Sequence, residues 1–159
     1  MPVTRAAALL ALAACSSDPG NPSCGPREAV VARVIDGDTI VLTTGVKIRY
    51  LLINAPETTN GHNDCYGQNA ATFNSDLVLG KRVDLTYDVQ CEDMFGRTLA
   101  YVSVDGQEVN SLMIQRGYAC LLHISPDGDA RVAEFKGYET DAKAAKRGLW
   151  GACDPIPCN

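Results

Sequence analysis

Short apolar segments separated by turn residues dominate the chain between residues 30 and 53. Residues 30–35, 40–42 and 46–53 are rich in Val, Ile and Leu, which predicts three β-strands. Asp-Gly at 36–37 tolerates the positive φ that a two-residue hairpin needs, and Thr-Gly at 44–45 makes a second turn. The pattern therefore predicts three consecutive strands joined by two tight turns.

Two charged residues fall on apolar faces of these strands. Side chains alternate between the two faces of a strand, so Asp38 shares a face with Ile40, and Arg49 shares a face with Leu51. Burying an unpaired charge is costly, so we expect each to find a partner or a ligand at a rim. Glu57 follows just past the third strand, in a loop, where functional residues concentrate.

The rest of the chain alternates between helical and strand patterns. A 3.6-residue period with Gly80 at its end predicts a helix over residues 67–79. The remaining expected elements are strands over 81–89 and 96–104, a short helix over 109–116, an extended segment over 118–124 and a last helix over 130–147. We see no repeat and no second domain, so one core is expected.

The N-terminus has the pattern of an export signal. Residues 6–14 are all Ala and Leu, a run too short to span a bilayer. Residues 12–15 resemble a bacterial lipobox in which Cys15 is lipidated, and an ordinary signal peptide with an A-x-A site is the alternative. We predict a signal peptide or lipobox over 1–15, a flexible tether over 16–28 and one folded domain over 29–159. The protein is thus expected to be exported, either lipid-anchored in the cell envelope or secreted.

Composition changes this picture in two ways. The chain has seven cysteines, and removing Cys15 leaves an even number, which suits disulfides in an oxidising compartment. No C-x-x-C occurs and there are only 2 histidines, which argues against a metal-cluster protein. The net charge of −5 at pH 7 is unfavourable for non-specific nucleic-acid binding, so any such contact must be local to a site.

Two motifs resemble those of a known family. Residues 33–58, RVIDGDTIVLTTGVKIRYLLINAPET, and residues 93–101, DMFGRTLAY, are similar to the paired motifs of the staphylococcal nuclease (thermonuclease) family. The resemblance extends over residues 29–150 in order and spacing. It implies an α+β fold, a five-stranded OB-type β-barrel with three α-helices, and a calcium-dependent phosphodiesterase site.

The resemblance also implies catalytic roles. Glu57 matches the family's general base or water-positioning carboxylate. Arg49 and Arg97 match the two arginines that clamp the phosphate, each with a planar fork of donors.

The metal ligands implied by the resemblance include one departure. Asp38 matches a direct calcium ligand, and Ala55 matches a residue that offers its backbone carbonyl. Asn54 stands where the family has a second metal-binding Asp, so one negative charge is missing. Calcium affinity follows ligand charge. We therefore expect Ca²⁺ to bind weakly, and Mn²⁺ or Mg²⁺ to be able to substitute for it.

The cysteine pairs are open from sequence, since six cysteines allow 15 connectivities. The family's layout favours Cys91 with Cys120, and Cys24 with either Cys153 or Cys158 would join the two chain ends.

The motifs and the site residues favour a monomeric nuclease. We expect its substrate to be DNA, with RNA as a second substrate. One alternative is a catalytically inactive OB-fold nucleic-acid-binding module, but a pure binder has no need of Glu57, Arg49 and Arg97 together. A disulfide-stapled envelope protein without a nucleic-acid role is the third hypothesis. It explains the cysteines but not the order of the site residues.

Overall fold

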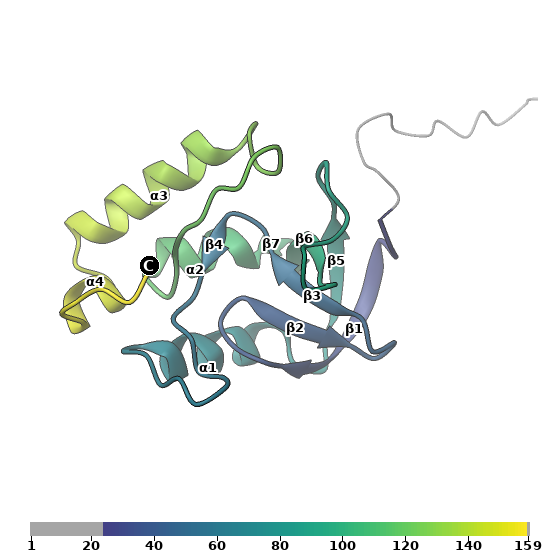
Figure 1. Ribbon diagram of the computed structural model, residues 1–159, viewed down its shortest axis with the longest axis horizontal. Coiled ribbons are helices and arrows are strands. Elements are labelled where there is room, and N and C mark those ends of the chain that lie inside the picture. Colours follow the sequence, from purple (N-terminus) through teal and green to yellow (C-terminus); the bar gives the residue numbers. More distant parts are fainter. Residues whose placement is uncertain (1–23, 159) are drawn as a thin grey trace, which may run out of the picture.

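Five strands form a closed barrel in the computed structural model, which describes residues 24–158 (Figure 1). The neighbour order is β3-β2-β1-β5-β6, and parallel pairing of β3 with β6 closes the barrel. The strands are β1 (Glu28–Val34), β2 (Thr39–Leu42), β3 (Lys47–Tyr50), β5 (Arg82–Thr86) and β6 (Thr98–Val104). With its helices this is an α+β fold of the OB type, which confirms the expected fold class.

The third predicted strand is shorter than expected. β3 ends at Tyr50, and Leu52 adopts a positive φ of 63° before β4 (Ile53–Asn54) begins. The reason is a change of partner, because β3 pairs with β2 and β6 whereas β4 pairs with β8 (Cys120–Leu121) in a separate two-stranded sheet. The prediction of one strand over 46–53 was therefore wrong at its second half.

The turn at residues 36–37 also differs from the predicted two-residue hairpin turn. Gly37 is not in the positive-φ region, and the connection between β1 and β2 is longer than a two-residue turn, since Val34 pairs with Ile40. A Cβ at Gly37 would lie 2.6 Å from the Cβ of Ala55 and 2.8 Å from that of Ala70. Glycine is thus needed here for close packing. The turn at Gly45 has the expected positive φ of 88°.

Within residues 24–158, four helices accompany the barrel: α1 (Gly67–Val78), α2 (Val109–Gln115), α3 (Val132–Ala144) and the short α4 (Leu149–Ala152). α2 follows β7 (Gln107–Glu108) and packs against β6 and α3 (Figure 1). The last helix was predicted to reach residue 147, but Lys146 and Gly148 have positive φ and the chain turns there. None of these helices is long and apolar enough to cross a membrane.

The disulfides differ from the favoured pairs. Cys24 bonds to Cys91, Cys65 to Cys153 and Cys120 to Cys158. The pairings of Cys91 with Cys120 and of Cys24 with a C-terminal cysteine were therefore wrong. Because β1 pairs antiparallel with β5, the segment before β1 lies at the β5–β6 hairpin, and Cys24 therefore meets Cys91. The C-terminal segment lies beside β8, where Cys158 meets Cys120.

The start of the described chain is fixed to the barrel. Besides the Cys24–Cys91 bond, the Tyr87 hydroxyl donates to the Pro26 carbonyl at 2.6 Å. Residues 24–28, which were predicted to belong to the tether, therefore lie on the barrel, and the rest of the predicted tether lies outside the described residues. Cys15 and the export segment lie outside the described residues, so lipidation and export remain predictions.

Candidate active site

One polar cavity of about 480 Å³ opens at the rim of the barrel. The residues that the sequence predicted for the site all line it: Asp38, Arg49, Asn54, Ala55, Glu57 and Arg97. They come from the β1–β2 connection, from β3 and β4, from the loop after β4 and from the β5–β6 hairpin. The barrel thus brings together residues from three separate parts of the sequence.

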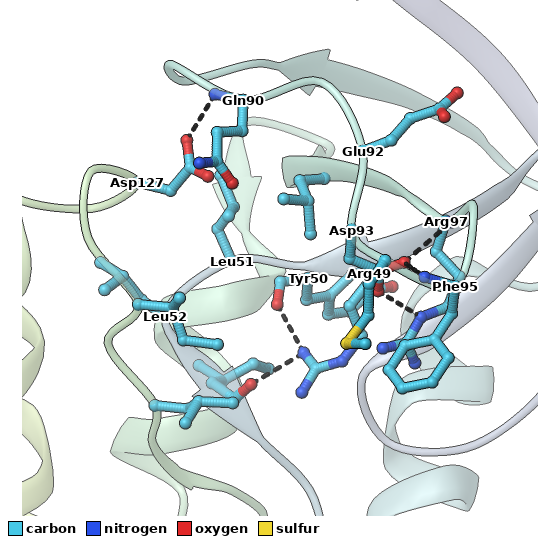
Figure 2. Close-up of a pocket in the computed structure, with 15 residues that line it drawn as sticks. Arg49, Tyr50, Leu51, Leu52, Gln90, Glu92, Asp93, Phe95, Arg97 and Asp127 are labelled. Atoms are coloured by element: carbon cyan, nitrogen blue, oxygen red, sulfur yellow. Dashed lines mark hydrogen bonds and ion pairs between the residues drawn. The ribbon is translucent and has the colours of Figure 1, made fainter.

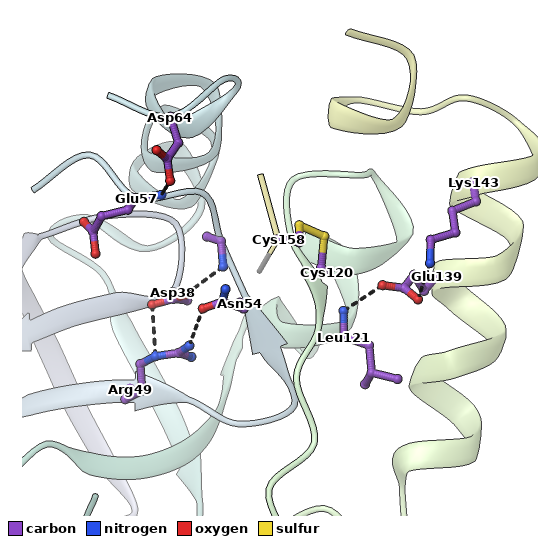
Figure 3. Close-up of a disulfide and its surroundings, with 11 residues drawn as sticks. Asp38, Arg49, Asn54, Glu57, Asp64, Cys120, Leu121, Glu139, Lys143 and Cys158 are labelled. Atoms are coloured by element: carbon purple, nitrogen blue, oxygen red, sulfur yellow. Dashed lines mark hydrogen bonds and ion pairs between the residues drawn. A yellow bond between two sulfur atoms is a disulfide. The ribbon is translucent and has the colours of Figure 1, made fainter. Parts of the chain in front are cut away.

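Arg49 is held by four contacts (Figures 2 and 3). Its Nε lies 3.2 Å from Asp38 Oδ1, and its Nη1 donates to the carbonyls of Tyr50 at 2.6 Å and Ile53 at 2.8 Å. Its Nη2 donates to Asn54 Oδ1 at 3.2 Å. The turn at Leu52 makes this possible, because it folds the carbonyls on both sides of the strand break toward one guanidinium. The charge expected on an apolar face is therefore paired.

Asp38 connects this arginine to the next strand. Its Oδ2 accepts from the backbone N–H of Ala55 at 2.7 Å, and its Oδ1 accepts from the Thr39 hydroxyl at 2.9 Å. The side chains of Asp38 and Arg49 are only 7% and 9% exposed. The pair is thus buried, hydrogen-bonded and fixed in orientation, which is the condition under which a buried ion pair is tolerated.

Asp36 is a second buried carboxylate beside the first. Its Oδ1 accepts from the Asp38 N–H at 3.0 Å, and its backbone carbonyl accepts from Asn74 Nδ2. Burial raises the pKa of Asp36 to about 7, and the negative charges of Asp38 and Glu57 act in the same direction. The cavity therefore holds two adjacent carboxyl groups, of which Asp38 is paired with Arg49.

Glu57 is held at the cavity by its own loop. Its Oε1 accepts from the backbone N–H groups of Thr58 at 2.9 Å and Thr59 at 2.7 Å and from the Thr59 hydroxyl at 2.5 Å. Asp64 Oδ2 accepts from the Glu57 N–H at 3.0 Å. Partial burial acts to raise the pKa of Glu57, but these hydrogen bonds outweigh it and lower the pKa below its usual value. Glu57 is therefore ionised at neutral pH.

Arg97 is oriented by a carboxylate of its own hairpin (Figure 2). Asp93 accepts from Arg97 Nε at 2.7 Å, from Arg97 N at 3.0 Å and from Phe95 N at 2.9 Å. The guanidinium carbon lies 5.4 Å from the centroid of the Phe95 ring. Within the described chain the Nη donors of Arg97 have no hydrogen-bond partner, so they can donate to a ligand in the cavity.

The oxygen groups at the cavity suit a hard cation. Carboxylate oxygens of Asp36 and Asp38 and the amide oxygen of Asn54 are ligand types that Ca²⁺ prefers. Among residues 24–158, however, no three His, Cys, Asp or Glu side chains are grouped as a preformed metal site. The donor chemistry fits a calcium ion, and its binding would require these side chains to exchange some of their present partners.

An apolar groove of about 300 Å³ adjoins the cavity and shares Arg49, Phe95 and Arg97 with it. Met94 and Phe95 are 90% and 74% exposed on one side, and Ile124 is 64% exposed on the other. The rim of the barrel thus carries a charged cavity and, beside it, the apolar groove drawn in Figure 2.

Several residues at the site were not predicted. Asp36 was interpreted as a turn residue, although two aspartates two positions apart at a strand end could have indicated a carboxylate pair. Asp93 was part of a recognised motif but was given no role. Asp64 and Pro157 carry no local signal, because only the tertiary structure brings them to the cavity.

Fold and site together define an α+β protein of the OB-barrel class with a polar cavity on the barrel rim that is lined by carboxylates and arginines. Comparison with known proteins is consistent with this class. Residues 47–152 match the family described as "Staphylococcal nuclease homologue". Since that match covers more than half of the chain, this protein belongs to the staphylococcal nuclease family.

Three curated relatives illustrate the similarity. The chain is 37% identical over 125 residues to "Endonuclease YncB" of Bacillus subtilis (strain 168), covering 74% of this chain and 59% of that protein. It is 35% identical over 130 residues to "SPbeta prophage-derived endonuclease YokF" of the same organism, covering 77% and 44%. An "Uncharacterized endonuclease" of Escherichia coli O157:H7 is 33% identical over 147 residues, 84% of each chain. The chain spans about half the length of the two Bacillus proteins.

Proposed function

We propose that this protein is a nuclease that hydrolyses phosphodiester bonds of DNA, and of RNA as a further substrate. The observation that carries the proposal is the convergence of Glu57, Arg49 and Arg97 on one cavity in a member of this family. Relatives named endonucleases support the same reaction class. An inactive binding module would have no use for an ionised, oriented carboxylate that shares one cavity with two arginines.

The geometry of Glu57 suits a general base. Its Oε1 is occupied by the Thr58 and Thr59 donors, which leaves Oε2 to accept a proton from, or to orient, an attacking water. Because the lowered pKa keeps Glu57 ionised, the proton acceptor is available at neutral pH.

The two arginines supply the positive charge that a phosphoryl group needs as its oxygens gain electron density. Arg97 keeps its Nη fork available in the cavity, whereas Arg49 has contacts on all three of its nitrogens. We therefore assign the main phosphate contact to Arg97 and a preorganised, partly shared contact to Arg49.

Metal assistance is part of the proposal, since the family is generally metal-dependent. Asp38, Asn54 and Ala55 would hold Ca²⁺, with Asp36 supplying further negative charge beside it. When bound, the ion would supply Lewis-acid stabilisation of the developing negative charge. Burial is the main cause of the raised pKa of Asp36, and the neighbouring charges of Asp38 and Glu57 add to it, so a cation bound beside these groups would favour the ionised form of Asp36.

The substrate contacts are proposed to be local. A protein of net charge −5 lacks the broad basic surface that drives non-specific nucleic-acid binding. The exposed Phe95 ring beside Arg97 offers a surface against which a base of the substrate can stack.

The deciding experiment is a cleavage assay of the purified protein on plasmid DNA, single-stranded DNA and RNA. Each substrate is incubated with Ca²⁺, with Mn²⁺, with Mg²⁺ or with a chelator. We expect cleavage that depends on the divalent ion. Binding of the substrates without cleavage in any solution would favour the inactive binding module instead.

A further inference from the structure

The last described segment of the chain is held at both ends by disulfide bonds, which we call the two staples. In residues 153–158, Cys153 bonds to Cys65 and Cys158 bonds to Cys120. Between the two bonds, Ile156 packs with Cys120 and Leu149 in a small apolar cluster. We call residues 153–158 the strap. Because it is bonded at both ends and packed in between, the strap is a fixed part of the domain.

The two staples attach to two different segments that contribute residues to the candidate active site. Cys65 directly follows Asp64, whose carboxylate accepts from the Glu57 N–H at 3.0 Å. Cys120 pairs with Asn54 across the two strands β4 and β8. Figure 3 shows the Cys120–Cys158 bond beside Asn54, with Glu57 and Asp64 on the loop above.

The strap also forms part of the cavity wall. Pro157 lines the same cavity as Glu57 and Arg49, and it is half-buried there. The strap therefore runs from the loop that holds the proposed base to the strand pair that holds Asn54, and it contacts the cavity on the way. Within the described residues, this covalent path bypasses the barrel strands.

We propose that the strap is a brace that positions the Glu57 loop against the β4–β8 side of the cavity, and that turnover depends on both staples. The loop that carries Glu57 is otherwise held by its own turn hydrogen bonds, by Asp64 and, at its start, by the hydrogen bond from Ala55 N–H to Asp38. Proximity effects are steep, since a misplacement of about 1 Å can lower turnover by ~10²-fold. Cys65, Cys120, Cys153 and Cys158 are positioning residues on this proposal, which rests on the proposed nuclease activity.

The test compares three paired substitutions at a temperature where all variants are folded. Cys65→Ser with Cys153→Ser opens one staple, and Cys120→Ser with Cys158→Ser opens the other. Cys24→Ser with Cys91→Ser is the matched control, because it removes a disulfide that does not hold the strap. That control leaves the Asp93–Arg97 contacts of the hairpin in place. The readouts are kcat and KM on single-stranded DNA, together with the melting temperature.

If the strap is a brace, the variants should show a specific pattern of changes in kcat, KM and melting temperature. Opening either staple should lower kcat by about tenfold to a hundredfold with little change in KM. A fourth variant that combines the two staple pairs should lose no more kcat than either pair alone, because a brace fails when either end is released. The control should lose melting temperature but keep its kcat.

Two outcomes would overturn the brace while leaving the nuclease intact. One is wild-type kcat in both staple variants, and the other is an equal loss of kcat in all three disulfide variants, which would indicate a general effect of lowered stability. A wild-type protein that cleaves nothing under any condition would instead overturn the proposed function, and the brace with it.

Discussion

Arg49 and Arg97 share a residue type but differ in how much of the side chain is committed to the protein. Arg49 meets a carboxylate, two carbonyls and an amide oxygen, which uses most of its five donors. Within the described residues, the Arg97 guanidinium donates only to Asp93, through its Nε, and lies over the Phe95 ring. Arg49 therefore mainly holds the site together, whereas Arg97 has hydrogen-bond donors available for a ligand.

The first prediction at this scale concerns Glu57. Glu57→Gln should lower turnover by ~10²–10⁴-fold, because the amide cannot accept a proton from water. Glu28→Gln is the matched control, since Glu28 is an exposed glutamate on β1 that pairs with Arg82 away from the cavity. Steady-state kinetics on single-stranded DNA gives the comparison. Equal activity of the two variants would remove Glu57 from the mechanism.

The second concerns Asn54, whose Oδ1 accepts from Arg49 Nη2. Asn54→Asp adds a carboxylate at the proposed ion site, which should strengthen Ca²⁺ binding by at least ~1 kcal/mol even at high effective dielectric. The Ca²⁺ concentration for half-maximal activity should therefore fall by about fivefold or more.

The control for this second prediction is stability in chelator, which should change little because Arg49 remains beside the new carboxylate. Calcium titrations of both proteins, by activity and by direct binding, provide the measurement. Identical midpoints would mean that the ion does not bind at this residue.

At the scale of elements, the β5–β6 hairpin carries both Arg97, the proposed phosphate contact, and the side chain that orients it. Asp93 accepts three hydrogen bonds from Phe95 and Arg97 within one turn. Partial burial acts to raise the pKa of Asp93, but these hydrogen bonds outweigh it and lower the pKa below 3.8. The hairpin turn is thus stabilised by an ionised carboxylate.

The third prediction follows from this lowered pKa. Because the folded-state pKa lies below the unfolded value, the stabilisation by Asp93 is fully present above 3.8 and is lost as the pH falls through the folded-state pKa. Asp93→Asn should therefore lower the free energy of unfolding by ~1 kcal/mol at neutral pH, with the difference shrinking in acid.

The same substitution should raise KM, since Arg97 loses its orienting partner. The measurements are denaturant unfolding of both proteins over the acid range and steady-state kinetics at neutral pH. A stability difference that is independent of pH would show that the charge of Asp93 does not contribute.

At the scale of the whole molecule, the disulfides fix both ends of the described chain. The Cys24–Cys91 bond holds the start of the described chain on the barrel, and the two staples hold the strap, its last segment, at the site. All six described cysteines are paired, which suits an oxidising compartment. Cys15 is the one cysteine left over from these pairs.

The fourth prediction is that Cys15 becomes the lipidated N-terminus of the exported protein. Metabolic labelling with a fatty acid in a bacterial host should mark the wild-type protein and not Cys15→Ser. Labelling of both proteins to the same extent would contradict lipidation, and export without any label would favour the ordinary signal peptide.

The sequence by itself determined the fold class and the identity of the candidate site residues. Strand and helix periodicity are local properties, so the barrel strands, α1 and α2 were predicted close to their observed positions. The paired motifs around Asp38, Glu57 and Arg97 identified the family because the order and spacing of motifs can be read from the sequence without a structure.

Only the tertiary structure decided which distant groups meet. The end of β3 at Tyr50 depends on the change of strand partner, and Gly37 is needed because Ala55 and Ala70 approach it across the fold. The disulfide pairs and the place of Pro157 at the cavity depend on where β8 and the strap come to lie. These are contacts between residues far apart in sequence, set by packing of the whole chain, and no local pattern encodes them.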